Sequence, residues 1–224
     1  MIPWRRLGEG RADGSGTLVL AERDGEYSIR VGGQELMSSR AHGSEEAMAQ
    51  LTLAAAAPRD GMRILVAGLG MGFTLRATLD AARPDAAVVV AELVPAVVEW
   101  NRGPLAELAA RPLADPRVTV ETVEVGRLLR STRTRFDAIL FDIDNGPAAL
   151  TRPANQVLYG VQGLGLVRGA LRTGGAFSVW SAAASPEFER TLARAGFSDV
   201  AAHRAAARGA AGGPAHTIFL ALAR

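Results

Sequence analysis

The sequence contains no cysteine and no lysine, and both absences restrict its chemistry. Without cysteine there is no disulfide, no thiolate nucleophile and no cysteine-based zinc or iron–sulfur site. All 25 basic residues are arginines, which excludes Schiff-base chemistry, a lysine general base and the lysine of a Walker-type phosphate loop. The sequence has only three histidines and no carboxylates at ligand spacing, so we expect no metal site.

Long apolar runs are also missing. No apolar segment reaches the roughly 18 residues of a transmembrane helix, and the N-terminal MIPWRRLGEG lacks the apolar core of a secretory signal. We therefore expect a cytoplasmic protein without a membrane partner. The net charge is only +2 and the arginines are scattered. The basic pI of about 9.8 thus indicates a solvated surface rather than a nucleic-acid partner.

The apolar content, 48% of 224 residues, supports one α/β domain with a small appendage. From residue 62 onward, strand patterns alternate with helix patterns, which predicts βαβ units and a mostly parallel sheet whose last strand is antiparallel. The strands are expected at 62–68, 86–93, 117–122, 136–144, 176–182, 197–202 and 216–223. A helix is expected from residue 95 to about residue 110, and a flexible loop over 204–214. This pattern predicts a Rossmann-like domain over residues 58–224.

Residues 1–57 form the expected appendage. Strand patterns with glycine turns over 17–38 predict a small β-meander. A helix is expected over 43–57, with Ser44 as its N-cap. Because short strands expose an edge that needs a cover, we expect the protein to form a homodimer.

The stretch RILVAGLGMGFTLR, residues 63–76, carries most information about function. It predicts a buried strand, a turn bracketed by Gly68, Gly70 and Gly72, and a helix whose free N–H groups face a ligand. The G-x-G-x-G spacing differs from the G-x-G-x-x-G of dinucleotide sites and favours a cofactor without phosphates. Met71 is expected to touch this cofactor through its backbone.

Three acidic residues fall at the ends of successive strands, where ligands bind in such folds. Glu92, followed by Leu93, is placed to accept hydrogen bonds from ribose hydroxyls. Glu124, followed by Val125, can reach an adenine amino group. Together with Asp142 these residues predict an adenosyl cofactor, and the antiparallel last strand favours S-adenosylmethionine. An NAD-type domain and a non-binding Rossmann-like fold are the alternatives.

The motifs resemble the spermidine synthase-like branch of the class I S-adenosylmethionine-dependent transferases, over about residues 60–180. AGLGMGFTLR is similar to that family's GGGDGGTLRE, and FDAILFDIDNGP to FDVIIVDSSDPVGP. The resemblance implies a class I methyltransferase fold, with Glu92 as the ribose-binding acid and Glu124 as the adenine-side acid. It also implies that Asp142 accepts a proton from an amine, and that Tyr159 belongs to a lid segment.

Departures from the family's motifs bear on the reaction. Met71 replaces the Asp that holds the aminopropyl amine of decarboxylated S-adenosylmethionine, and DIDNGP is two residues shorter than its counterpart. The family's Tyr-His-Glu is also missing. These differences favour methyl transfer to a small-molecule amine over aminopropyl transfer. A non-catalytic cofactor-binding domain and a nucleic-acid methyltransferase are further hypotheses.

On the acceptor side, Asp142 is the candidate base and Asp144, on the same side of the strand, the next. Asn145 is placed to orient an amine, although both Asp144 and Asn145 also suit a plain turn. Tyr159 is a further catalytic candidate. Trp180 and His42 are candidates for the acceptor pocket, with core packing or a surface position as their alternatives.

The last histidine, His216, begins the final strand, and we expect it to have only a structural role.

Overall fold

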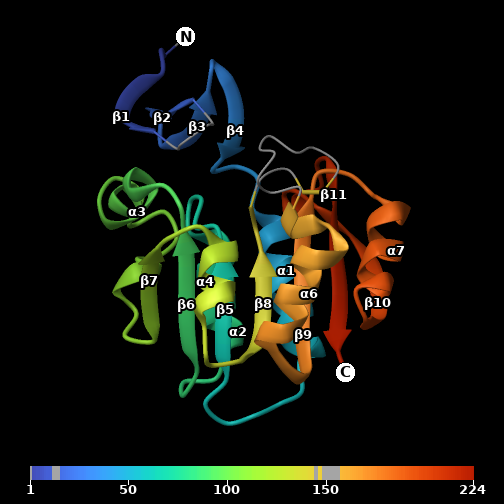
Figure 1. The fold of residues 1–224 in the computed structure, drawn as a ribbon. Helices are drawn as coiled ribbons and strands as arrows, with labels where there is room; N and C mark the ends of the chain where they lie inside the picture. Colours follow the sequence, from blue (N-terminus) through green and yellow to red (C-terminus); the bar gives the residue numbers. More distant parts are fainter. Residues whose placement is uncertain (1, 12–15, 144–145, 148–156) are drawn as a thin grey trace.

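The computed structural model describes residues 2–11, 16–143, 146–147 and 157–224. It contains a four-stranded N-terminal sheet above a seven-stranded sheet that carries helices on both faces (Figure 1). The N-terminus leads into the small sheet, and the C-terminus follows the last strand of the large sheet.

The N-terminal sheet is an antiparallel meander in chain order. Its strands are β1 (Arg5–Arg11), β2 (Thr17–Arg23), β3 (Glu26–Val31) and β4 (Gln34–Ser38). Asp24 and Gly25 join β2 to β3, both with positive φ (52° and 77°), as a type I′ hairpin turn requires. The predicted meander over 17–38 is present, and β1 is an addition to it.

Strand β1 packs on helix α3 (Pro95–Arg102) through two glycines. Gly8 and Gly10 lie two residues apart and so share one face of the strand. A Cβ on Gly8 would lie 2.6 Å from Nε1 of Trp100, and one on Gly10 would lie 2.6 Å from Cβ of Ala96. The glycines therefore allow the N-terminal sheet to rest directly on α3.

The large sheet has the strand order β10-β11-β9-β8-β5-β6-β7. Its strands are β5 (Arg63–Ala67), β6 (Ala87–Glu92), β7 (Val118–Thr122), β8 (Phe136–Phe141), β9 (Leu171–Ser181), β10 (Phe197–Ala206) and β11 (Ala215–Ala223). Strand β11 is antiparallel to both of its neighbours, whereas the others pair in parallel. This order confirms the predicted Rossmann-like fold with an antiparallel last strand.

The helices cover the two faces of this sheet (Figure 1). They are α1 (Gly43–Ala55), α2 (Phe73–Ala81), α3, α4 (Val125–Ser131), α6 (Val161–Ala170) and α7 (Pro186–Arg194), with short 3₁₀ turns η1 (Pro112–Ala114) and η2 (Gly209–Ala211). Alternate strand residues point to opposite faces, so Ile64 and Leu140 pack towards α1 and α2, whereas Leu65 and Phe141 pack towards α4, α6 and α7. None of the described helices is long and apolar enough to cross a membrane.

Some expected boundaries were wrong. Helix α3 ends at Arg102 rather than near residue 110, and turns follow it. Helix α1 begins after His42, so Ser44 lies inside the helix and is not its N-cap. Strand β10 extends to Ala206, into the stretch that was expected to be a loop.

Candidate functional site

The glycine loop leaves β5 at the centre of the sheet and enters α2. Gly68 has a φ of +90°, and a Cβ there would lie 2.1 Å from the carbonyl oxygen of Asp142. Gly72 is the N-cap of α2 with a φ of +87°. Only glycine fits the first position, because a side chain would meet backbone and the left-handed φ is unfavourable for other residues. The loop is thus pressed against the end of β8.

Met71 places its side chain in the core, where it is 4% exposed. The side-chain amide of Asn101 donates to the carbonyl of the preceding Gly70 at 2.9 Å. On the other side of the loop, Sδ of Met37 from β4 lies 3.2 Å from the position of a Cβ on Gly70. The N-terminal sheet therefore reaches the glycine loop, and Met71 can meet a ligand only through its backbone.

Glu92 ends β6 and is buried beside the loop, at 7% exposure. Its carboxylate accepts hydrogen bonds from the backbone N–H of Leu69 at 2.9 Å and of Val94 at 2.8 Å. Leu93 between them is exposed. Glu92 thus holds the glycine loop against the end of β6. A carboxylate can accept about four hydrogen bonds, so this clamp is compatible with the predicted contact to a ribose.

Glu124 caps helix α4. Its carboxylate accepts the backbone N–H of Gly126 at 2.7 Å and of Arg127 at 2.8 Å, and Val125 beside it is buried. This arrangement satisfies two of the unpaired N–H groups of the first helical turn. The role of Glu124 in the structure is that of a cap, and its contact with an adenine stays a prediction.

Asp142 directly follows β8 and lies partly buried next to the glycine loop. Its Oδ2 accepts a hydrogen bond of 2.5 Å from Oγ1 of Thr74, in the first turn of α2. Burial raises the pKa of Asp142 to about 6, the hydrogen bond from Thr74 opposes this rise, and the charge of Glu92 adds to it. A carboxyl group of this pKa can exchange a proton near neutral pH.

The N-terminus of α1 brings a group to the site that the sequence did not single out. Oγ of the fully buried Ser44 receives the indole N–H of Trp180 at 3.0 Å and lies 2.8 Å from Nδ1 of His216. Ser44 in turn donates to Oε2 of Glu45 at 2.6 Å. Burial and then the charge of Asp142 raise the pKa of Glu45 to about 7. Glu45 and Asp142 therefore lie close enough for their charges to interact.

His42 and Tyr159 lie at the border of this site. The ring of His42 stacks on Phe73 with 4.2 Å between centroids, and its Nδ1 lies 2.8 Å from Oε1 of Glu46. Tyr159 is buried on the opposite face of the sheet and donates its hydroxyl to the carbonyl of Ile143 at 3.1 Å. It thus contacts the segment that follows Asp142.

Asp144 and Asn145 lie outside the described residues, so their predicted roles stay predictions.

Four residues of this site escaped the sequence analysis as functional groups: Ser44, Glu45, Thr74 and His216. The only sequence signal for Glu45 was its place in the first turn of a helix, where acids are common. Ser44, which binds Glu45, has its own partners in β9 and β11, more than a hundred residues away along the chain. No local sequence pattern reveals such contacts.

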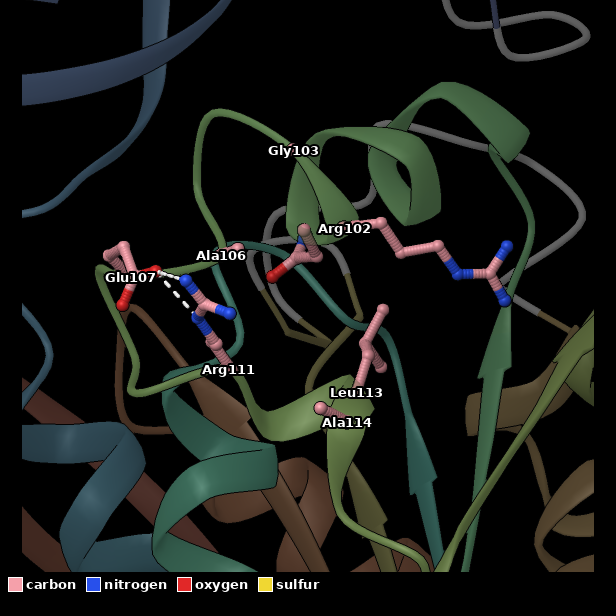
Figure 2. Close-up of a pocket in the computed structure, with 8 residues that line it drawn as sticks. Arg102, Gly103, Ala106, Glu107, Arg111, Leu113 and Ala114 are labelled. Atoms are coloured by element: carbon pink, nitrogen blue, oxygen red, sulfur yellow. Dashed lines mark hydrogen bonds and ion pairs between the residues drawn. The ribbon is translucent and has the colours of Figure 1, made fainter.

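Two hollows lie elsewhere on the surface. One of about 320 Å³ lies between the end of α3 and η1; Figure 2 shows the ion pair of Glu107 and Arg111 at one side of it and the extended Arg102 at the other. A second, of about 410 Å³, lies between α4 and α6 and is bordered by Arg130, Arg133 and Arg135. Neither is lined by Asp142 or Glu45.

The fold is similar to that of solved spermidine synthases. The enzyme from Thermotoga maritima superposes with a TM-score of 0.76 at 18% identity, covering 98% of this chain and 73% of that chain. A spermidine synthase in complex with the transition state analogue AdoDATO gives a TM-score of 0.78 at 18% identity, with coverages of 98% and 74%. TrmN from Thermus thermophilus gives 0.57 at 21% identity, covering 88% of this chain and 56% of that one.

No protein-family model and no curated protein matches the chain. The structural likeness includes the N-terminal sheet, because nearly the whole chain is covered by the spermidine synthases. The neighbours therefore establish the fold that the motifs predicted. At these identities they establish no reaction.

Proposed function

We propose that the chain is an S-adenosylmethionine-dependent transferase that methylates a small-molecule amine. The observation that carries this proposal is the packing of Gly68 against the backbone of Asp142. This packing brings the glycine loop that follows β5 and a carboxyl group of raised pKa to the same end of the sheet, and we infer that an adenosyl cofactor lies there. The likeness to spermidine synthases supports the cofactor class.

The residues of this end of the sheet fit such a cofactor. The glycine loop follows β5 and packs against the end of β8, and Glu92 lies at the end of the neighbouring strand β6. The sulfonium of the bound cofactor supplies an electrophilic methyl carbon. The acceptor attacks it with the nitrogen lone pair while the carbon–sulfur bond breaks and its electrons stay on sulfur. In-line attack needs alignment and a neutral amine, so the protein must position the amine and take a proton.

Asp142 is our candidate for the base that takes that proton. As a carboxylate it can accept a hydrogen bond from the ammonium form of the acceptor and then remove one proton. Its pKa of about 6 means that it is largely ionised at neutral pH, so it is in the form that a base requires. Thr74 holds one of its oxygens and so fixes the direction of the carboxylate.

Aminopropyl transfer from decarboxylated S-adenosylmethionine is the second candidate, because the most similar folds described above include two spermidine synthases. We favour methyl transfer because Met71 buries an apolar side chain where the resembling family has a carboxylate. Without that carboxylate the site has less to hold the amine of the aminopropyl group.

Titration calorimetry with S-adenosylmethionine and with its decarboxylated form separates the two reactions. We expect the first to bind at least about tenfold more tightly, a difference of about 1.4 kcal/mol. The reverse preference would exclude methyl transfer, and the absence of binding by either compound would exclude both reactions.

Asp142→Asn separates an enzyme from a binding domain. We expect this variant to bind the cofactor within about twofold of the wild type and to lose methyl transfer to an amine panel by about a hundredfold. An unchanged rate would remove Asp142 from the mechanism.

A further inference from the structure

Glu45 has a raised pKa, and the reaction proposed above does not use it. It lies in the first turn of α1, is partly buried, and is joined to β9 and β11 through Ser44. We propose that Glu45 is a second acceptor-binding carboxylate, which holds the ammonium group of the acceptor opposite Asp142. This inference rests on the proposed function, since it assigns a further residue to the acceptor side of the same site.

The hydrogen bonds around Ser44 fix the direction of Glu45. Ser44 has one hydroxyl hydrogen, and it donates that hydrogen to Oε2 of Glu45. The indole of Trp180 can only donate, so it gives its N–H to Ser44. With the hydroxyl hydrogen used, Nδ1 of His216 must also carry a hydrogen and donate it to Ser44. Two donors thus converge on a buried hydroxyl that points at Glu45.

The hydrogen bonds from Ser44 and from its own backbone N–H favour the charged form of the Glu45 carboxylate. A carboxylate accepts about four hydrogen bonds, so about two remain for a ligand. Among the described residues, no other side chain donates a hydrogen bond to the Glu45 carboxylate. Trp180 and His216 also pack edge to face, with 4.6 Å between ring centroids. The two rings therefore support each other where they donate to Ser44.

The charges around Glu45 indicate what the ligand is. Asp142 at the end of β8 and Glu46 on α1 both act on Glu45 as like charges, and Glu46 is itself paired with His42. Thr74, which binds Asp142, carries no charge. Burial and the like charges raise the pKa of Glu45 to about 7. A protonated amine between Glu45 and Asp142 would relieve this repulsion, whereas a neutral hydroxyl or an anion would not.

The proton balance with two carboxylates is simple. The acceptor enters as an ammonium, held by Glu45 and Asp142. One carboxylate takes one proton, and the neutral nitrogen then attacks the cofactor. The nitrogen regains a positive charge as the new carbon–nitrogen bond forms and the carbon–sulfur bond breaks. The carboxyl group afterwards releases its proton to water. Glu45 thus acts as the binding partner that keeps the nitrogen in place when Asp142 is protonated.

The test uses 1,4-diaminobutane and n-butylamine as cationic probes and 1-butanol as the neutral control. All three are titrated into the wild type loaded with S-adenosylhomocysteine, which prevents turnover. We expect the two amines to bind and the alcohol not to bind. Glu45→Gln should weaken amine binding by about tenfold, while the matched Glu46→Gln on the same helix should change it by less than about twofold.

Two further readouts separate this role from a purely structural one. The chain has three histidines, so their imidazole NMR signals can be resolved. Amine binding should shift the signal of His216 and leave that of His203, on β10, unchanged. Amine affinity of the wild type should rise from pH about 6 to about 8, as Glu45 with its pKa of about 7 ionises. Glu45→Gln should flatten this rise.

The proposal is overturned if Glu45→Gln binds the amines as the wild type does, if the wild type binds neither amine, or if the His216 signal stays unchanged on binding. These failures differ from a failure of the proposed function, which would appear as loss of cofactor binding in the calorimetry. A protein that binds S-adenosylmethionine and methylates an amine with Glu45→Gln fully active would keep the function and lose only this inference.

Discussion

Asp142→Asn tests the electrostatics of the site through stability alone, without knowledge of the acceptor. The pKa of Asp142 rises from 3.8 to about 6 on folding, a change of about 2 units. One unit corresponds to about 1.4 kcal/mol, so the charged carboxylate destabilises the folded state by at most about 3 kcal/mol. Because the side chain is only partly buried, water screens some of this, and we expect about 2 kcal/mol.

The direction of the effect follows from linkage. A pKa that is higher in the folded than in the unfolded state stabilises the fold below pH 3.8, and this contribution is lost as the pH rises through about 6. Asn carries no charge at any pH and still accepts the hydrogen bond from Thr74. The variant should therefore be more stable than the wild type at pH about 8 by about 2 kcal/mol, with a melting temperature about 4 to 8 °C higher.

Urea unfolding of both proteins at several pH values measures this difference, which should shrink towards zero below pH about 4. Asp137→Asn is the matched control, because Asp137 is 1% exposed but is paired with Arg172 at 2.7 Å and accepts the N–H of Arg63 at 2.8 Å. Breaking these contacts should destabilise the protein by about 3 kcal/mol. If Asp142→Asn were equally stable as or less stable than the wild type at pH about 8, the electrostatic reasoning for this site would be refuted.

Three glycine substitutions test the packing around the site, and a fourth, Gly25→Ala, is the control for the first. Gly68→Ala should destabilise the protein by more than about 2 kcal/mol and abolish cofactor binding, because its Cβ meets the backbone of Asp142. Gly25 has a positive φ but open space around it, so Gly25→Ala should lower the free energy of unfolding, measured in urea, by only about 1 kcal/mol. Gly8→Ala should push β1 off Trp100 and expose the N-terminal sheet to limited proteolysis, with the rest of the chain intact; unchanged cleavage would contradict this. Gly43→Ala, whose Cβ would lie 2.1 Å from the backbone nitrogen of Gly209, should displace the start of α1. We expect amine affinity to fall by about tenfold while cofactor affinity stays within about twofold, and equal losses of both in calorimetry would contradict the separation of the two sides.

The order of strands and helices in the large domain could be predicted from the sequence, because its apolar segments are long and are separated by turn residues at regular intervals. Strand β1 was not recognised, since RRLGEGR is polar and contains two glycines. Its stability comes from pairing with β2 and from packing on α3, neither of which is local. The end of α3 was misplaced for a similar reason: helix-forming residues continue to residue 110, but the chain turns at Gly103.

For the site, the acids at the ends of parallel strands could be placed because strand order fixes where they meet. The hydrogen bonds that these acids make within the protein could not be predicted from the sequence. Glu92 and Glu124 both hold backbone N–H groups of adjacent loops, a contact that depends on the exact path of each turn. These acids therefore hold the glycine loop and the start of α4 in place, and the proposed cofactor would share carboxylates that already bind backbone N–H groups.

The proposed acceptor side combines segments from both ends of the chain. The N–H of Gly43 donates to the carbonyl of Ala207 at 2.8 Å, which joins the start of α1 to the turn between β10 and β11. That link sets Ser44 within reach of His216, and Ser44 in turn donates to Glu45. The antiparallel last strand thus has a second consequence besides completing the sheet: it supplies a histidine that contacts Ser44 on α1. A Rossmann-like domain without α1 would keep the glycine loop and Asp142 but would lack the second carboxylate that we propose for an amine.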